Sequence, residues 1–149
     1  MATEIERKFL VSGEFLGLAV KNHLITQYYI SVDPDKIIRI RIIEDNAFLT
    51  IKSRIMSGSF GRNEWEFSIP VSEAKELVNI CLPGKVIKTR YYVPSESHTF
   101  EVDVFHDKNE GLVIAEIELN SEDEKFVKPA WLGDEITGLS EYYNSNLIK

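Results

Sequence analysis

Polar and apolar residues alternate with a period of two along seven segments of this chain. Successive side chains of a β-strand point to opposite faces, so residues two apart share one face. The intervening positions are largely apolar, as Ile38, Ile40 and Ile42 illustrate. The pattern therefore predicts strands with one apolar and one charged face. The polar faces carry Glu4, Glu6 and Lys8; Arg39 and Arg41; Thr50 and Lys52; Arg62, Glu64 and Glu66; Lys88 and Arg90; Glu101 and Asp103; Glu116 and Glu118.

The strand pattern recurs in eight segments with turn residues between most of them. The link at residues 44–47 has the composition of a hairpin turn, and residues 57–61 predict a flexible loop. The order of elements predicts a mainly β (α+β) fold, an antiparallel barrel or sandwich with a few short flanking helices. The predicted strands span residues 4–11, 24–32, 36–43, 48–53, 62–69, 86–93, 99–105 and 112–119.

Helical signals are few. Ser72 predicts an N-cap, and apolar residues at helical spacing follow it, so a short amphipathic helix is expected to run to Leu82. The last thirty residues predict helix or loop. In that segment the acidic run 122–124 indicates the first turn of a helix, and Trp131 is expected to anchor the tail.

Composition places the chain among folded single domains. Its 149 residues predict one domain, residues 1–149, and 44% hydrophobic residues argue against disorder. No apolar run approaches the roughly 18 residues of a membrane span, and the first residues do not resemble a signal peptide. The net charge of −7 disfavours nucleic acid and anionic membranes as partners. A cytoplasmic location is therefore expected.

Six of the charged faces carry like-charge pairs, and these pairs bear on function. Like charges on one strand face repel, so recurrent pairs of both signs favour a face that holds opposite charges from outside. If that face lines a barrel, carboxylates would hold metal cations and bases would hold an anion. The apolar outer face would then need cover from the helix, the tail or a second subunit, which makes a homodimer an expectation. An open sandwich with a wet charged face is the alternative.

The ligand follows from coordination chemistry. Mg²⁺ binds through one or two carboxylates together with substrate phosphates, and Arg and Lys suit phosphate oxygens. No Ser/His or Cys/His nucleophile pair stands out, so a metal-activated water is the expected attacker. In the empty tunnel, repulsion is expected between neighbouring carboxylates around Glu116 and between Arg39 and Arg41.

The ordered motifs resemble those of the CYTH superfamily, the triphosphate tunnel metalloenzymes. Residues 4–11, EIERKFLV, resemble its E-x-E-x-K motif, and the remaining charged pairs follow in the family's order. The resemblance implies an eight-stranded antiparallel tunnel and a reaction on a triphosphate that depends on Mg²⁺ or Mn²⁺. It implies metal-binding roles for Glu4, Glu6, Glu64, Asp103, Glu116 and Glu118. It implies phosphate-binding roles for Lys8, Arg39, Arg41, Lys52, Arg62, Lys88 and Arg90. Candidate catalytic groups are Lys8, Lys52, Lys88 and Tyr29, although adjacent Tyr28 competes for the last assignment.

Within that superfamily the chain resembles the short stand-alone bacterial inorganic triphosphatases. The alternatives are a class IV-type adenylyl cyclase, a nucleoside or thiamine triphosphatase, and a non-catalytic module that binds polyphosphate or nucleotide. Strand parity predicts that Phe9, Trp65, Phe67 and Phe105 lie outside the tunnel. Little apolar surface would then remain for a nucleobase, which favours the small-molecule inorganic triphosphate as substrate.

Overall fold

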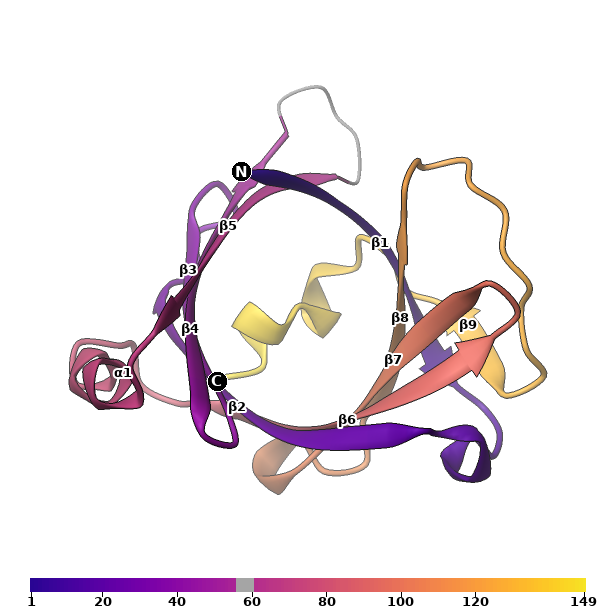
Figure 1. Cartoon of the computed structure of the whole chain (residues 1–149), viewed down its shortest axis with the longest axis horizontal. Helices are drawn as coiled ribbons and strands as arrows, with labels where there is room; N and C mark the ends of the chain where they lie inside the picture. The colour runs from indigo at the N-terminus through magenta and orange to yellow at the C-terminus, as the bar shows by residue number, and fades with distance from the viewer. Residues whose placement is uncertain (56–60) are drawn as a thin grey trace.

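The strands form a closed antiparallel barrel (Figure 1), and its inward side chains line a cavity, called the tunnel below. The computed structural model describes residues 1–55 and 61–149, so the predicted loop at 57–61, apart from Gly61, lies outside the described residues. Within them, nine strands form one sheet in the order β5-β4-β3-β2-β6-β7-β8-β1-β9, and pairing of β5 with β1 closes the barrel. The strands are β1 (Ala2–Val11), β2 (Lys21–Ser31), β3 (Ile37–Ile43), β4 (Asn46–Arg54), β5 (Arg62–Ile69), β6 (Val86–Ser95), β7 (His98–Phe105), β8 (Val113–Leu119) and β9 (Leu132–Glu135). The predicted eight-stranded barrel is thus confirmed.

Strand β9 was not expected from the sequence. It pairs with β1 at Phe9 and Val11, on the edge that β5 leaves free after pairing with residues 2–4. Gly133 permits this contact, because a Cβ atom there would lie 2.8 Å from the carbonyl oxygen of Leu10. Four residues are too few to display a strand period, which is why the helix-or-loop prediction was wrong here. The acidic run 122–124 is also not helical.

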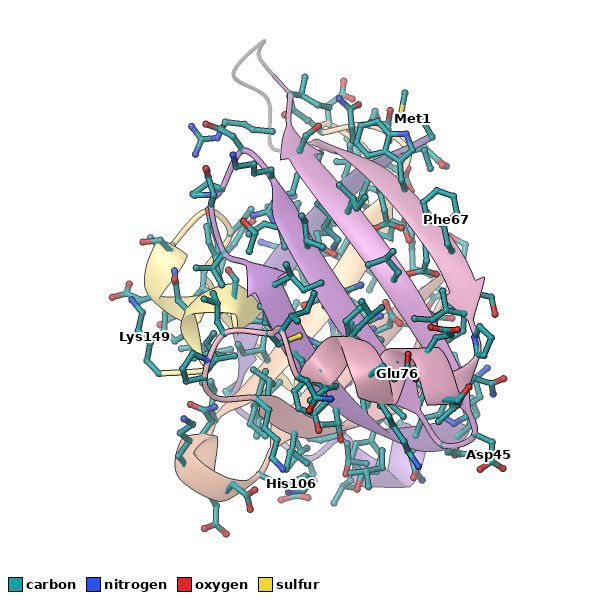
Figure 2. All side chains as sticks on the ribbon, turned by 90° about the vertical axis from the view of Figure 1, so that its left-hand side faces the viewer. Met1, Asp45, Phe67, Glu76, His106 and Lys149 are labelled. Atoms are coloured by element: carbon teal, nitrogen blue, oxygen red, sulfur yellow. The ribbon has the colours of Figure 1, made fainter. Side chains whose placement is uncertain are left out.

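Two segments cover the outer face of the barrel: the tail around Trp131 and the α-helix that follows β5. Near β1, β7 and β8, Phe9, Phe100 and Ile117 pack with Trp131, which anchors the tail segment as predicted. Trp131 lies edge-on to Phe100, with ring centroids 5.2 Å apart. On the opposite side, the single α-helix of the described residues covers β3 and β4 (Figures 1 and 2). Much of the apolar core therefore lies outside the barrel, between these strands and the segments that cover them.

Helix α1 (Val71–Val78) is shorter than the predicted helix and begins earlier. Its first hydrogen bond runs from the amide of Ala74 to the carbonyl oxygen of Pro70, so Pro70, not Ser72, is the N-cap. Ala74 is fully buried against Ile40 and Ala47. After Val78 the bonds shorten to three-residue spacing, as from Cys81 to Val78, and the α-helix ends.

Parts of the outer surface remain apolar and exposed. Phe67 on β5 is 52% exposed, and Leu24 on β2 is 54% exposed (Figure 2 labels Phe67). The structure contains one chain, so the expected homodimer stays a prediction. Among the described residues, no helix is long and apolar enough to cross a membrane.

The C-terminal tail packs into one end of the barrel, where an apolar cluster closes the tunnel (Figure 1). Two short 3₁₀ helices, η3 (Ser140–Tyr142) and η4 (Asn144–Asn146), lie in this tail. The cluster contains Tyr29, Ile37, Val86, Phe105, Ile114, Ile136 and Ile148.

The prediction that Phe105 lies outside the tunnel was wrong, since Phe105 shares the strand face of Glu101 and Asp103. The ammonium of Lys88 lies 5.6 Å from the centre of its ring. Two further 3₁₀ turns, η1 (Leu16–Leu18) and η2 (Asp107–Asn109), complete the elements.

Candidate functional site

The tunnel contains a cavity of about 220 Å³ whose wall is almost entirely polar. Every predicted site residue lines it except Asp103, which is fully buried behind the wall. The sequence-predicted residues in the wall are Glu4, Glu6, Lys8, Tyr29, Arg39, Arg41, Lys52, Arg62, Glu64, Lys88, Arg90, Glu116 and Glu118, joined by Glu66 and Glu101. Four further residues in the wall were not predicted: Ile37, Tyr143, Asn144 and Ser145. Barrel closure thus brings residues from eight strands, β1 to β8, to one site.

The wall divides into an acidic side and a basic side. Neighbouring strands β5, β1, β8 and β7 carry the carboxylates, whereas β4, β3 and β6 carry most of the bases and β2 contributes Tyr29. Lys8 on β1 and Arg62 on β5 are the bases of the acidic side. The register explains this arrangement, because Glu6 pairs with Glu118 and Lys8 pairs with Glu116 in the ladder.

Salt bridges form between the two sides and also within the acidic side. The ammonium of Lys52 donates to both carboxylate oxygens of Glu4 at 2.9 and 3.1 Å and lies 3.6 Å from Glu64. The ammonium of Lys8 lies 3.6 Å from the carboxylate of Glu116. In each pair, a bound anion could replace the carboxylate as partner of the lysine, and a bound cation could replace the lysine as partner of the carboxylate.

Asp103 lies between two bases behind the wall. Its Oδ1 accepts from Nε of Arg90 at 2.7 Å, and its Oδ2 accepts from Nη2 of Arg90 at 2.9 Å. The ammonium of Lys88 also lies 2.8 Å from Oδ2. Although burial opposes the shift, Arg90 and Lys88 lower the pKa of Asp103. The contacts favour a role in holding the bases, and the metal-binding role of Asp103 stays a prediction.

The basic side is electrostatically strained without an anion. Burial, together with Arg39 and Arg90, lowers the pKa of Arg41 to about 10. Burial and neighbouring Arg90 and Arg41 lower the pKa of Lys88 to about 7, against the opposing effect of Asp103. Arg39 is only 7% exposed, and its Nε is buried with no hydrogen-bond partner among the described residues. An orphaned donor of this kind is costly unless an anion supplies an acceptor.

The acidic side shows the complementary strain. Burial and the carboxylates of Glu116 and Glu4 raise the pKa of Glu6 to about 7. Burial and a hydrogen bond with Glu4 raise the pKa of Glu64 to about 7, and burial also raises the pKa of Glu118. A bound cation would relieve this repulsion.

Glu116 behaves differently from these neighbours. Burial raises its pKa, but Lys8, Arg90, Lys88 and Lys52 together hold that pKa well below the usual range. The expectation that carboxylate repulsion dominates at Glu116 was therefore wrong, because the attraction of the surrounding bases outweighs the repulsion from Glu6.

The donor set fits a divalent cation that shares its coordination with substrate. Within residues 1–55 and 61–149, no three acidic, histidine or cysteine side chains are already grouped around one metal position. The carboxylates of Glu4 and Glu116 are held by Lys52 and Lys8 instead. Mg²⁺ needs only one or two protein carboxylates when phosphate oxygens and water complete its shell. The crowded glutamates meet that requirement.

Buried Gln27 is a site residue that the sequence analysis missed. Its Oε1 accepts hydrogen bonds from Nε and Nη2 of Arg41 at 3.0 and 2.8 Å, and its Nε2 donates to the hydroxyl of Tyr29 at 3.0 Å. Tyr29 faces the cavity, whereas Tyr28 packs with the cluster under α1. Strand parity with Tyr29 was the signal that could have identified Gln27.

Residues 2–147 match the family described as "CYTH domain". The chain belongs to the CYTH family. An inorganic triphosphatase of Acetivibrio thermocellus is 46% identical over 150 residues, which cover 100% of this chain and 95% of that protein. An inorganic triphosphatase of Nitrosomonas europaea is 35% identical over 154 residues, covering 97% and 96% of the two chains.

The fold of this CYTH chain is also found in solved structures. The crystal structure of the inorganic triphosphatase NE1496 aligns with a TM-score of 0.66 and 32% identity. The alignment covers 99% of this chain and 95% of that structure. The predicted family and tunnel fold are therefore confirmed.

Proposed function

We propose that this CYTH protein hydrolyses inorganic triphosphate to diphosphate and phosphate in its tunnel, with the help of a divalent metal ion. The observation that carries the proposal is a buried basic side, with an orphaned donor on Arg39, facing a crowded acidic side across one cavity. A triphosphate bridged to a metal ion carries charges of both signs that match these two sides. The names of its close relatives support the same activity.

The metal would be held by Glu4, Glu6, Glu116 and Glu118, with Glu64 beside them. When bound, Mg²⁺ or Mn²⁺ would neutralise charge on the phosphates and acidify a water molecule. Asp103 is assigned to the basic side, where it orients Lys88 and Arg90.

The bases have separable roles in this proposal. Arg39, Arg41, Arg90, Lys52 and Arg62 would bind phosphate oxygens, and Lys8 would bridge the phosphate and metal regions. Lys88, a candidate catalytic group whose ammonium is held by Asp103, would donate to a phosphate oxygen and stabilise the charge that develops in the transition state. Tyr29, held by Gln27, would orient that water or a phosphate oxygen.

Substrate preference follows from the lining of the cavity. Its apolar or aromatic members are few: Ile37, Tyr29 and Tyr143. Phe105, although on the tunnel side, is buried below Lys88 and does not line the cavity. Inorganic triphosphate needs no base-stacking surface, whereas ATP or thiamine triphosphate would leave its organic group with little apolar contact.

A phosphate-release assay with metal across inorganic triphosphate, ATP, thiamine triphosphate and diphosphate tests the proposal. Inorganic triphosphate should have the highest kcat/KM, and diphosphate should be poor because it cannot reach both the basic and metal-binding sides. Comparable turnover of ATP, or formation of cyclic AMP, would favour the nucleotide enzymes. Binding of triphosphate without any turnover would favour a non-catalytic module.

Arg39→Ala should lower kcat/KM for inorganic triphosphate about ten- to a hundredfold, as expected for a lost hydrogen bond to a charged group. The melting temperature should hold or rise slightly, since the substitution removes a buried unpaired donor and a cation that lowers the pKa of Arg41. Kinetics and thermal melts check both parts. Lys75→Ala, which removes an exposed cation on α1 outside the cavity wall, is the control. Wild-type kinetics for Arg39→Ala would contradict the phosphate role.

The remaining expectations are part of the same proposal. We infer one functional domain over residues 1–149, a cytoplasmic location, and no nucleic-acid or membrane partner. Sedimentation of the purified protein tests the expected homodimer.

A further inference from the structure

The C-terminal tail inserts an amide side chain into the tunnel wall. Asn144, in η4, lines the cavity, and its Oδ1 accepts a hydrogen bond from the ammonium of Lys88 at 2.8 Å. The same oxygen lies 3.4 Å from Nε2 of Gln27. Asn144 is 56 residues from Lys88 in the chain, so only the packed tail brings the two together.

Two fixed acceptors orient the Lys88 ammonium. This group has three N–H donors, and it lies 2.8 Å from Oδ2 of Asp103 and 2.8 Å from Oδ1 of Asn144. With two donors directed at protein oxygens, tetrahedral geometry determines the direction of the third. Lys88 is only 1% exposed and lines the cavity, so that third donor position is available to a ligand in the tunnel.

The tail that carries Asn144 is anchored to the barrel by specific contacts. The ammonium of Lys108 donates to the carbonyl oxygen of Ile148 at 2.7 Å, and Nδ2 of Asn109 donates to that of Leu147 at 2.9 Å. Gly84, at φ +95°, lies where any Cβ atom would collide with the Ile148 backbone. The position of Asn144 is therefore set by contacts outside the tunnel.

We propose that Asn144 is a positioning residue that aims the Lys88 ammonium at the substrate and connects it, through Gln27, to Arg41. The inference rests on the proposed triphosphatase function. It assigns the tail a part in the site, because the ammonium would otherwise be held by Asp103 alone and could rotate about that single contact. Asp103 supplies the negative charge that pairs with the Lys88 ammonium, and the neutral amide of Asn144 sets the direction of the remaining N–H donor.

The test is a double-mutant cycle on kcat/KM for inorganic triphosphate, with Asn144→Ala and Lys88→Ala made singly and together. Asn144→Ala alone should lower kcat/KM about ten- to a hundredfold. In the Lys88→Ala background it should cost less than about twofold, because the group that it positions is gone. Metal-free calorimetric titration with inorganic triphosphate repeats the cycle on binding, without a need for turnover.

Asn146→Ala is the matched control. Asn146 lies in the same 3₁₀ helix, but its side chain donates to the carbonyl oxygen of Ser140 and does not line the cavity. It should leave kcat/KM unchanged. Wild-type kinetics for Asn144→Ala would overturn the inference. So would an Asn144→Ala substitution that lowers kcat/KM as much in the Lys88→Ala background as in the wild-type protein. A wild-type protein without turnover would instead contradict the proposed function, and the binding cycle would still test Asn144.

Discussion

Glu116→Gln should reduce metal-dependent triphosphate turnover more than about a hundredfold, because it removes the charge of a proposed metal ligand. It should also lower stability by about 3 kcal/mol, since the buried Lys8, Arg90 and Lys88 lose a compensating charge. For a chain of this length the melting temperature would fall about 6–12 °C. Steady-state kinetics at saturating Mg²⁺ and thermal melts measure the two effects.

Glu6→Gln is the matched comparison within the same acidic side. It should also impair metal-dependent turnover, but it should raise the melting temperature, because Glu6 is crowded by Glu116 and Glu4. The folded-state pKa of about 7 exceeds the ordinary 4.5, so ionised Glu6 destabilises the fold increasingly as pH rises between these values. The stabilising effect should be full at pH 8 and small near pH 5. Equal stability changes in the two variants would contradict the assignment of their surroundings.

Asp103→Asn should be the most destabilising single charge change in the tunnel, at about 3–5 kcal/mol, because it leaves Lys88 and Arg90 buried without their shared carboxylate. Turnover should fall as well, since both bases lose their orientation. The pKa of Asp103 is lowered in the folded state, so its contribution is present above the ordinary value of 3.8 and is lost as pH falls below it.

Urea unfolding at pH 7 and at pH 3 checks the sign of this effect. The difference in unfolding free energy between wild type and Asp103→Asn should be large at pH 7 and should shrink in acid. Asp107→Asn is the control, since Asp107 is exposed and its φ of 56° suits asparagine. If the difference in unfolding free energy between the two proteins did not change with pH, Asp103 would stabilise the fold through its shape and not through its charge.

The sequence by itself determined the faces of the barrel. A period of two assigns each residue to the core or the tunnel without knowledge of the partners, because side chains of a strand alternate strictly. That parity predicted the strands and the acids and bases that line the cavity, and the motif order predicted the CYTH family. Where parity was misapplied, at Phe105, the prediction was wrong.

Only the tertiary structure decided which charges meet and what closes the tunnel. Parity assigns a face but no partner, so it could not show Asp103 behind the wall, bound to Lys88 and Arg90. Nor could it reveal β9 or Asn144, which lie in a tail without a strand period and reach the barrel through contacts distant in sequence. Side chains of one face become a site only when register and closure set the distances between them. At those distances, burial and nearby carboxylates raise the pKa of Glu6, whereas nearby bases lower the pKa of Glu116 on the neighbouring strand.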